Sequence, residues 1–320
     1  MNLYGFFFHP LVRLISGSIL QGVLSVLGII ALVIILLKVS PADPTSGMGA
    51  NSVERRQQIA EQLGIDQPVY VMFWRWIERA ARGDLGTPYS ESNTTVVKML
   101  RLRALPTVYL LLLTYFIIIA IAIPLGIYLG LPRKAKLNNL LNSCLDFLGA
   151  LPDFWLASVL ALIFALNLRW LPRSSNNAAL SINVMIMPAL ALIFGSGRLA
   201  VFVRYTREEI SMVLSNKFIE LAFAKGIGRF KVLWRHALPN AIIPIFSYGI
   251  GSVPVFIGAT IVVESIFTYP GLGLLIYKAS KDSDYPMIIG ATLILALLVS
   301  LLNLFQRLFI YAVDPRVRES

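Results

Sequence analysis

Cysteine and histidine are almost absent from this sequence. Its 320 residues include one cysteine, Cys144, and two histidines, His9 and His236. A single cysteine excludes an internal disulfide framework and a cluster of thiolate metal ligands. Two distant histidines and one cysteine supply neither a metal site nor the converging nucleophile and base that a membrane-bound enzyme requires. We therefore expect no metal, no cofactor and no enzymatic activity of the chain by itself.

Charged residues are also scarce. They make up 14% of the sequence, against 57% hydrophobic residues, and the mean hydropathy is +0.74. These values lie outside the range of soluble globular proteins. The net charge of +11 would suit a nucleic-acid partner, but in so apolar a chain lysine and arginine more often mark cytoplasmic loops of a membrane protein. We expect the chain to lie in a lipid bilayer and to bind no nucleic acid.

Six apolar runs are long enough to cross a membrane. A bilayer core about 30 Å thick needs roughly 20 apolar helical residues to cross it. The first run is longer than the apolar part of a signal peptide and lacks a small-residue cleavage site, so it is predicted to be retained. The sequence predicts an all-α polytopic membrane protein with six transmembrane helices, at about 14–37, 106–131, 144–167, 184–203, 241–263 and 287–312.

Basic residues are distributed unevenly among the connections between these runs. The 133–139 connection has three basic residues and no acid, and the 204–240 connection has seven lysines and arginines against three glutamates. The 264–286 connection is slightly acidic, whereas the basic 168–183 connection runs against the trend. The positive-inside rule places the first two connections and both termini in the cytoplasm.

The predicted organisation has four parts. Residues 1–39 hold the cytoplasmic N-terminus and the first span, and residues 40–105 form an extracytoplasmic helical segment. Residues 106–312 form the core membrane domain with the other five spans and the cytoplasmic 204–240 loop, and residues 313–320 form a cytoplasmic tail.

Two short helices are predicted within the 40–105 segment. The first runs from Val53 to Gly64, where glycine ends it. The second, at about 69–82, carries an aromatic stripe of Tyr70, Phe73, Trp74 and Trp76. For this stripe we favour packing against the membrane domain over a ligand site.

Two acidic residues lie near the cytoplasmic end of the third predicted span. Asp146 and Asp153 are seven residues apart, which places them on one face of a continuous helix. They suggest the proton or cation site of an ion-gradient-driven secondary transporter. The nearby membrane edge and Pro152 favour capping of a helix end instead, and the internal inverted repeats typical of many secondary transporters are not evident.

The 204–240 connection has a helix-break-helix pattern. A continuation of the fourth span is predicted from Glu208 to Leu214, and a short amphipathic helix from Phe218 to Lys225, ended by Gly226. A further helix is predicted from Arg229 to His236, and Pro239-Asn240 is expected to mark the turn toward the fifth span. The small side chains of Ala222 and Ala224 are expected to let another protein approach the backbone closely. The pattern favours a docking helix over an ordinary surface loop.

The motif Glu220-x-Ala222-x-x-x-Gly226, followed after nine intervening residues by His236-x-Leu238-Pro239, resembles the EAA loop of permease subunits of bacterial ATP-binding cassette importers. Further segments resemble the dipeptide, oligopeptide and nickel permease family, and in particular the first of that system's two permeases. Leu221 departs from the second position of the motif, and the 172–184 stretch is short for the family. The additional matching segments are 43–44, 63–68, 82–86, 123–126, 151–156, 204–207, 264–273, 284–286 and 314–318.

The resemblance implies a type I importer permease fold in the bacterial inner membrane. Its expected partners are a second homologous permease subunit, two cytoplasmic ATPase subunits and an extracytoplasmic substrate-binding protein. No P-loop motif occurs in the chain, so ATP hydrolysis is expected on the ATPase subunits. The 218–226 helix would be the coupling helix, and the residues implied in ATPase coupling are Phe218, Glu220, Ala222, Phe223, Gly226, His236 and Pro239.

The transported solute is less well defined by the sequence. Di- and oligopeptides are favoured, and nickel or a metal chelate, opines and other small solutes remain alternatives. The 264–273 turn would lie at the outer end of the pathway, or would simply begin a short re-entrant or interfacial helix. The residues named as a possible pathway or gate are Asp146, Asp153, Glu264, Pro270 and Gly271.

Overall fold

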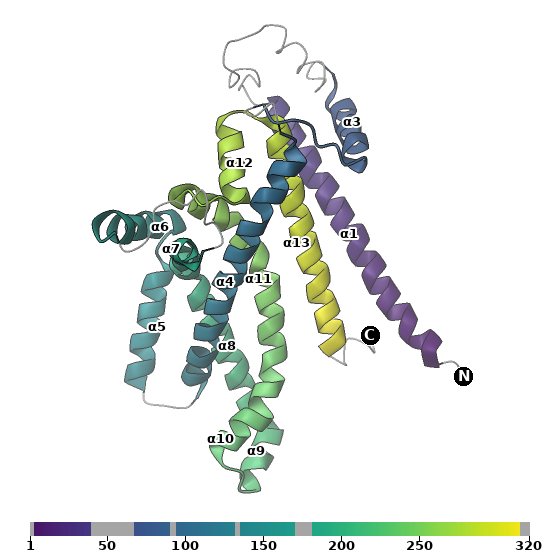
Figure 1. The fold of residues 1–320 in the computed structure, drawn as a ribbon. Helices are drawn as coiled ribbons and strands as arrows, with labels where there is room; N and C mark the ends of the chain where they lie inside the picture. Colours follow the sequence, from purple (N-terminus) through teal and green to yellow (C-terminus); the bar gives the residue numbers. More distant parts are fainter. Residues whose placement is uncertain (1–2, 40–66, 90–93, 132–134, 170–180, 314–320) are drawn as a thin grey trace.

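Helices make up all the regular structure in the described part of the chain. The computed structural model describes residues 3–39, 67–89, 94–131, 135–169 and 181–313, and the predicted all-α fold is confirmed (Figure 1). The α-helices are α1 Leu3–Val39, α3 Val69–Ala81, α4 Val96–Gly130, α5 Ala135–Gly149, α6 Asp153–Leu160, α7 Ile182–Phe194, α8 Arg198–Leu214, α9 Lys217–Ala224, α10 Arg229–Val232, α11 Leu238–Phe267, α12 Leu272–Lys281 and α13 Tyr285–Val313. Three further segments are shorter, namely the π-helical η1 Ala161–Asn167, which continues α6, the 3-10 turn η2 Gly195–Gly197 and the π-helical η3 Leu233–Ala237.

Five of the six predicted spans correspond to long apolar helices within the described ranges. The second begins ten residues earlier than predicted, at Val96 rather than at residue 106. Its first turns are helical because Val96 and Leu100 are buried in a small core with α12 and α13. The boundary expected at residue 105 therefore falls inside a helix.

The third predicted span, at 144–167, is not one continuous helix. The chain turns by 93° between 138–149 and 153–167, so that α6 and η1 run across the direction of α5 (Figure 1). A proline disfavours helical geometry in the residue before it, and Pro152 follows Leu151 at this bend. The carbonyl of Leu151 instead accepts a hydrogen bond from the backbone N–H of Ser196, at 2.9 Å.

The main core lies where α4, α7, α8 and α11 meet. Helices α4 and α8 approach each other closely at Gly126. A Cβ atom at this position would lie 2.5 Å from the Cβ of Thr206, which is wholly buried. Small residues at such a crossing let two backbones pack tightly, which is a common way for helices to associate inside a membrane.

Helix α1 lies at the edge of the bundle, where it packs along α13 (Figure 1). It exposes large apolar side chains, among them Leu20, Leu24 and Leu36, each about 60% exposed. A helix of this kind must face a hydrophobic solvent, which is what a lipid bilayer provides.

Helix α3 confirms the second helix predicted in the 40–105 segment and packs against the end of α1. Phe73 and Trp76 of the aromatic stripe contact a small core formed by α1 and α13, whereas Tyr70 and Trp74 are 66% and 65% exposed. The expected packing therefore holds for half of the stripe. The helix predicted at 53–64 lies outside the described residues.

Candidate functional site

The short helix predicted at 218–225 is present as α9, Lys217–Ala224. Together with α10 and η3 it forms a tip at one end of the bundle (Figure 1), and we call residues 217–237 the α9–α10 tip. Ile219 and Ala222 are buried, and they belong to the same core as Val232 and Ala237. Helix α9 is therefore fixed to the membrane domain along its inner face.

Gly226 ends α9 in a left-handed conformation, with φ of +76°. The N–H of Gly226 donates to the carbonyl of Phe223 at 2.9 Å, and the N–H of Ile227 donates to the carbonyl of Ala222 at 3.2 Å. This pair of hydrogen bonds is the Schellman motif, which satisfies the last carbonyls of a helix and favours glycine. The turn redirects the chain from α9 toward α10.

The outer face of the tip is apolar and unusually rich in aromatic residues. Phe230 and Trp234 lie one helical turn apart, with ring centroids separated by 6.0 Å. They were not singled out in the sequence, although their spacing of four residues in a basic loop was a visible signal. The large apolar side chains exposed on the tip are Phe218, Leu221, Phe223, Phe230 and Trp234.

The other coupling residues expected from the motif occupy different environments. Glu220 is exposed on α9, whereas Ala222 is 6% exposed and faces the core. The expectation that Ala222 lets another protein approach the backbone is therefore wrong, because neighbouring helices of the same chain cover it. Ala222 is small because α9 lies against its own membrane domain.

His236 and Pro239 lie on a continuous helix that runs from Arg229 to Phe267. His236 is half-buried, and its carbonyl accepts a hydrogen bond from the Asn240 side chain at 2.7 Å. The turn expected at Pro239 is absent, because the helix continues from η3 through Pro239 into α11. Pro239 lacks an N–H, and it follows directly on the π-helical turn η3, where the helical hydrogen-bond pattern already changes.

Asp153 and Arg198 form a part-buried ion pair at the 93° bend. The guanidinium of Arg198 contacts both carboxylate oxygens of Asp153, with N–O distances of 2.7 and 2.6 Å. The side chain of Arg198 is 8% exposed and that of Asp153 is 17% exposed. Arg198 also donates to the carbonyls of Leu192 and Gly195 and lies over the ring of Phe256. The pair links the start of α6 to the kink between α7 and α8.

Asp146 lies on α5 and pairs with Arg204 on α8 at 2.6 Å, in an exposed position. Asp146 and Asp153 therefore do not share a helical face, and that prediction is wrong because the chain bends between them. Each carboxylate has its own arginine. This arrangement does not form the paired acidic site that would suit an ion-driven transporter.

Glu264 lies at the corner between α11 and α12 and is wholly buried. One carboxylate oxygen accepts from the Thr107 hydroxyl at 2.8 Å, and the other accepts from the backbone N–H of Leu274 at 3.1 Å. Leu274 is in the first turn of α12, where unpaired N–H groups and the helix dipole favour an anion. Glu264 therefore stabilises the beginning of α12.

Pro270 and Gly271 form the turn at this corner. The carbonyl of Pro270 accepts from Arg103 at 3.4 Å, and a Cβ at Gly271 would lie 2.4 Å from each carboxylate oxygen of Glu264. The geometry is that of a packed chain reversal. The sequence did not reveal its partners on α4, Arg103 and Thr107, because they lie more than 150 residues from the turn.

Comparison with known proteins places these features in a wider group. A profile described as "Binding-protein-dependent transport system inner membrane component" matches residues 122–319. The chain is 33% identical over 301 residues to the oligopeptide transport system permease protein AppB of Bacillus subtilis, covering 91% of this chain and 94% of that protein. It is 32% identical over 303 residues to the glutathione transport system permease protein GsiC of Salmonella paratyphi A, covering 93% and 97%.

Proposed function

Because the chain belongs to the family of inner-membrane permease components of binding-protein-dependent transport systems, we propose that it forms one half of the translocation pathway of an ATP-driven peptide importer. The relatives described above are named for oligopeptides and for glutathione, which is itself a tripeptide. This supports peptides over nickel chelates, opines and other small solutes. The natural probe for transport is therefore a short peptide.

The α9–α10 tip is the proposed contact with a cytoplasmic ATPase. The observation that carries this role is the division of α9 into two faces: Ile219 and Ala222 are held in the core, whereas Phe218 and Leu221 are exposed at the end of the bundle. A partner that binds the exposed face of α9 would move the membrane helices when it moves, because the inner face of α9 is packed against those helices. ATP binding at a remote site can then bias two arrangements of the spans.

The remaining partners follow from the type of importer. A second homologous permease completes the pathway, two ATPase subunits hydrolyse ATP, and an extracytoplasmic binding protein delivers the peptide. The tip and both termini lie in the cytoplasm in this proposal. The beginning of α1 and the end of α13 lie toward the same end of the bundle as the tip (Figure 1), which supports this orientation.

Replacement of Gly226 by valine tests the coupling role. Valine at φ +76° is strained by roughly 1–3 kcal/mol, so the turn after α9 should rearrange and displace the contact with the ATPase. We expect Gly226→Val to insert into the membrane normally but to lose ATP-dependent peptide uptake. Uptake is measured with the complete complex and its binding protein in lipid vesicles.

Gly28→Val is the control. Gly28 lies in α1, outside the tip, and a Cβ there would meet no atom within 4 Å. It should therefore transport at close to the unmodified rate. Normal uptake by Gly226→Val would show that this turn does not transmit the ATPase motion.

A further inference from the structure

A pocket between α1 and α3 lies near one end of the membrane spans. It is lined by Ile34, five residues before the end of α1 at Val39, and by Ile289, four residues after the start of α13 at Tyr285. At 1.5 Å per helical residue the pocket is about 6–8 Å inside the helix ends. Amphipathic helices in the headgroup region of a bilayer bury their apolar face to a depth of about 5–10 Å.

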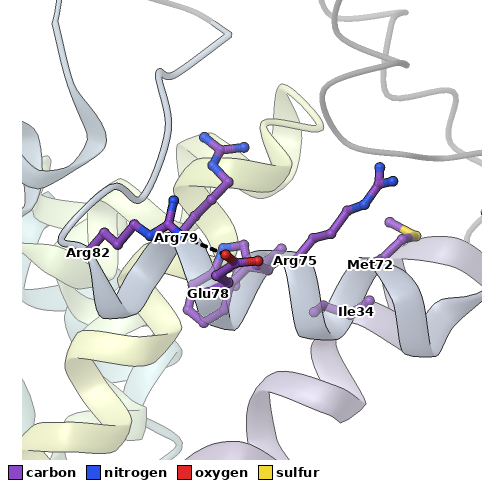
Figure 2. A pocket seen from close by; sticks show the side chains of 8 residues that line it. Ile34, Met72, Arg75, Glu78, Arg79 and Arg82 are labelled. Atoms are coloured by element: carbon purple, nitrogen blue, oxygen red, sulfur yellow. Dashed lines mark hydrogen bonds and ion pairs between the residues drawn. The ribbon is translucent and has the colours of Figure 1, made fainter.

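The pocket has an apolar side and a strongly basic side. Its volume is about 260 Å³. Figure 2 shows Ile34 on α1 at one side, with Met72 and Arg75 extending from α3. The residues that line it are Ile34, Met72, Arg75, Trp76, Glu78, Arg79, Arg82 and Ile289.

Two of the three arginines already have acidic partners. Arg82 pairs with Glu78 at 2.6 Å, and Arg79 pairs with Asp84 at 3.0 Å. The Arg79 guanidinium, together with the Gly86 N–H, lowers the pKa of the Asp84 carboxyl below its usual value. This pair is therefore ionised at neutral pH.

Arg75 differs from the other two arginines. It forms no hydrogen bond or ion pair with any residue that the structure describes. The indole N–H of Trp76, in the same pocket, is buried and has no acceptor in the described ranges. Among the residues that the structure describes, the pocket therefore has an exposed arginine without an acidic partner and a buried indole N–H without an acceptor.

We propose that this pocket binds the headgroup phosphate of a phospholipid, with Arg75 as the main cation and Trp76 as a second donor. Arginine matches the geometry of phosphate oxygens and forms charge-assisted hydrogen bonds with them. The acyl chains would continue along exposed apolar side chains beside the pocket, for example Ile35 of α1 and Leu297 of α13, which lie within about 100° of the lining residues Ile34 and Ile289 on their helices. Tyr70 and Trp74, both exposed on α3, are the residue types that concentrate at membrane interfaces.

A lipid suits the pocket better than a soluble ligand because the basic side adjoins an apolar helix surface. A free anion would use only the arginine, whereas a phospholipid satisfies the charge and also covers the neighbouring apolar side chains. The site is distinct from the coupling tip and from the proposed peptide pathway. Evidence against lipid binding here would therefore leave the proposed importer function unaffected.

The test measures lipid binding to the purified full-length permease after delipidation in detergent. Phosphatidylglycerol is titrated, and bound lipids are counted by native mass spectrometry. We expect one tightly bound lipid per chain, and Arg75→Gln should weaken its binding about tenfold or more. Arg75→Lys should bind with intermediate affinity, because it keeps the charge but loses the planar fork.

Arg101→Gln is the matched control, since Arg101 is exposed near the start of α4 and does not line the pocket. Arg101→Gln should bind phosphatidylglycerol as the unmodified chain does. An uncharged galactolipid should not bind tightly to the variant or to the unmodified chain. Equal binding by Arg75→Gln would overturn the proposal, and so would displacement of the lipid by inorganic phosphate at the lipid's own concentration. Reduced docking of the binding protein with unchanged lipid retention would assign the surface to that protein instead.

Discussion

The part-buried carboxylate of Asp153 and the buried carboxylate of Glu264 act at reversals of the chain. Asp153 joins the bend before α6 to the kink before α8 through Arg198, and Glu264 joins α4 to the start of α12 through Thr107. Charges are costly inside a membrane protein unless they are paired and hydrogen-bonded. Asp153 is ion-paired with Arg198. Glu264 is hydrogen-bonded to the Thr107 hydroxyl and the Leu274 N–H, and both side chains hold helix ends in place.

Removal of the charge at Asp153 should destabilise the fold. Asp153→Asn leaves the buried guanidinium of Arg198 without its carboxylate, and breaking a buried pair typically costs about 3–5 kcal/mol. We expect a clear fall in the unfolding temperature of the purified permease in detergent. Replacing both residues by neutral side chains of similar size should recover part of the loss.

Asp146→Asn provides the comparison for this experiment. Its pair with Arg204 is 59% and 44% exposed, and exposed pairs contribute about 0–1 kcal/mol. The unfolding temperature of this variant should scarcely change. Equal effects of the two substitutions would contradict the assignment of Asp153 to a buried structural pair.

The sequence indicated which polar residues matter but not what they contact. Asp153, Glu264 and Gly226 stood out because charge and glycine are conspicuous in and between apolar runs. The positive φ at Gly226 follows from local chemistry, and so the structure agrees with it. The pairing of Asp153 with Arg198 depends on contact across 45 residues, which no local pattern encodes.

Among the secondary-structure elements, long apolar helices were predicted most accurately. Their hydrophobic runs alone require burial in lipid, so five spans agree with the structure. The third span was misjudged, because composition does not distinguish a straight apolar helix from two joined at a right angle. Pro152 was visible, but its partner in the bend is the Gly195–Gly197 turn, which lies more than 40 residues away.

The two faces of α9 should respond differently to substitution. Leu221 is 56% exposed, so Leu221→Ala should leave stability within about 0.5 kcal/mol. The same change should weaken ATPase association by roughly 1–2 kcal/mol if Leu221 lies in the interface. The measurement pairs thermal unfolding with pull-down of the ATPase subunits at several concentrations.

Ile219→Ala is the counterpart on the inner face. Ile219 is wholly buried, and truncation of such a residue costs about 2–5 kcal/mol. Its main effect should therefore be on unfolding temperature. Identical profiles for the two variants would argue against a helix divided between the core and a partner.

At the scale of the whole molecule, the orientation of the bundle is open to direct measurement. Cys144 is the only cysteine in the chain, so Cys144→Ser gives a background without thiols. Single cysteines are then placed at Lys225 in the tip and at Arg82 after α3. A membrane-impermeant maleimide added to intact spheroplasts should label position 82 and should reach position 225 only after lysis.

The cysteine-free Cys144→Ser chain also allows the topology to be tested by labelling alone, without a transport assay. A cysteine introduced at Lys281, in the last turn of α12, should react from the outside as position 82 does. Labelling of position 225 in intact cells would reverse the proposed orientation. The positive-inside bias of the 204–240 connection predicts that position 225 is labelled only after lysis.

The position of α1 would also restrict how this chain meets the second permease subunit of the proposed importer. In Figure 1, α13 lies between α1 and the group formed by α4 and α11. One flank of α13 is thus occupied by α1 within the chain, so the proposed second permease would approach from another side. The wall that this chain contributes to a shared passage would then come from helices within residues 96–267, while α1 and α13 remain toward the lipid.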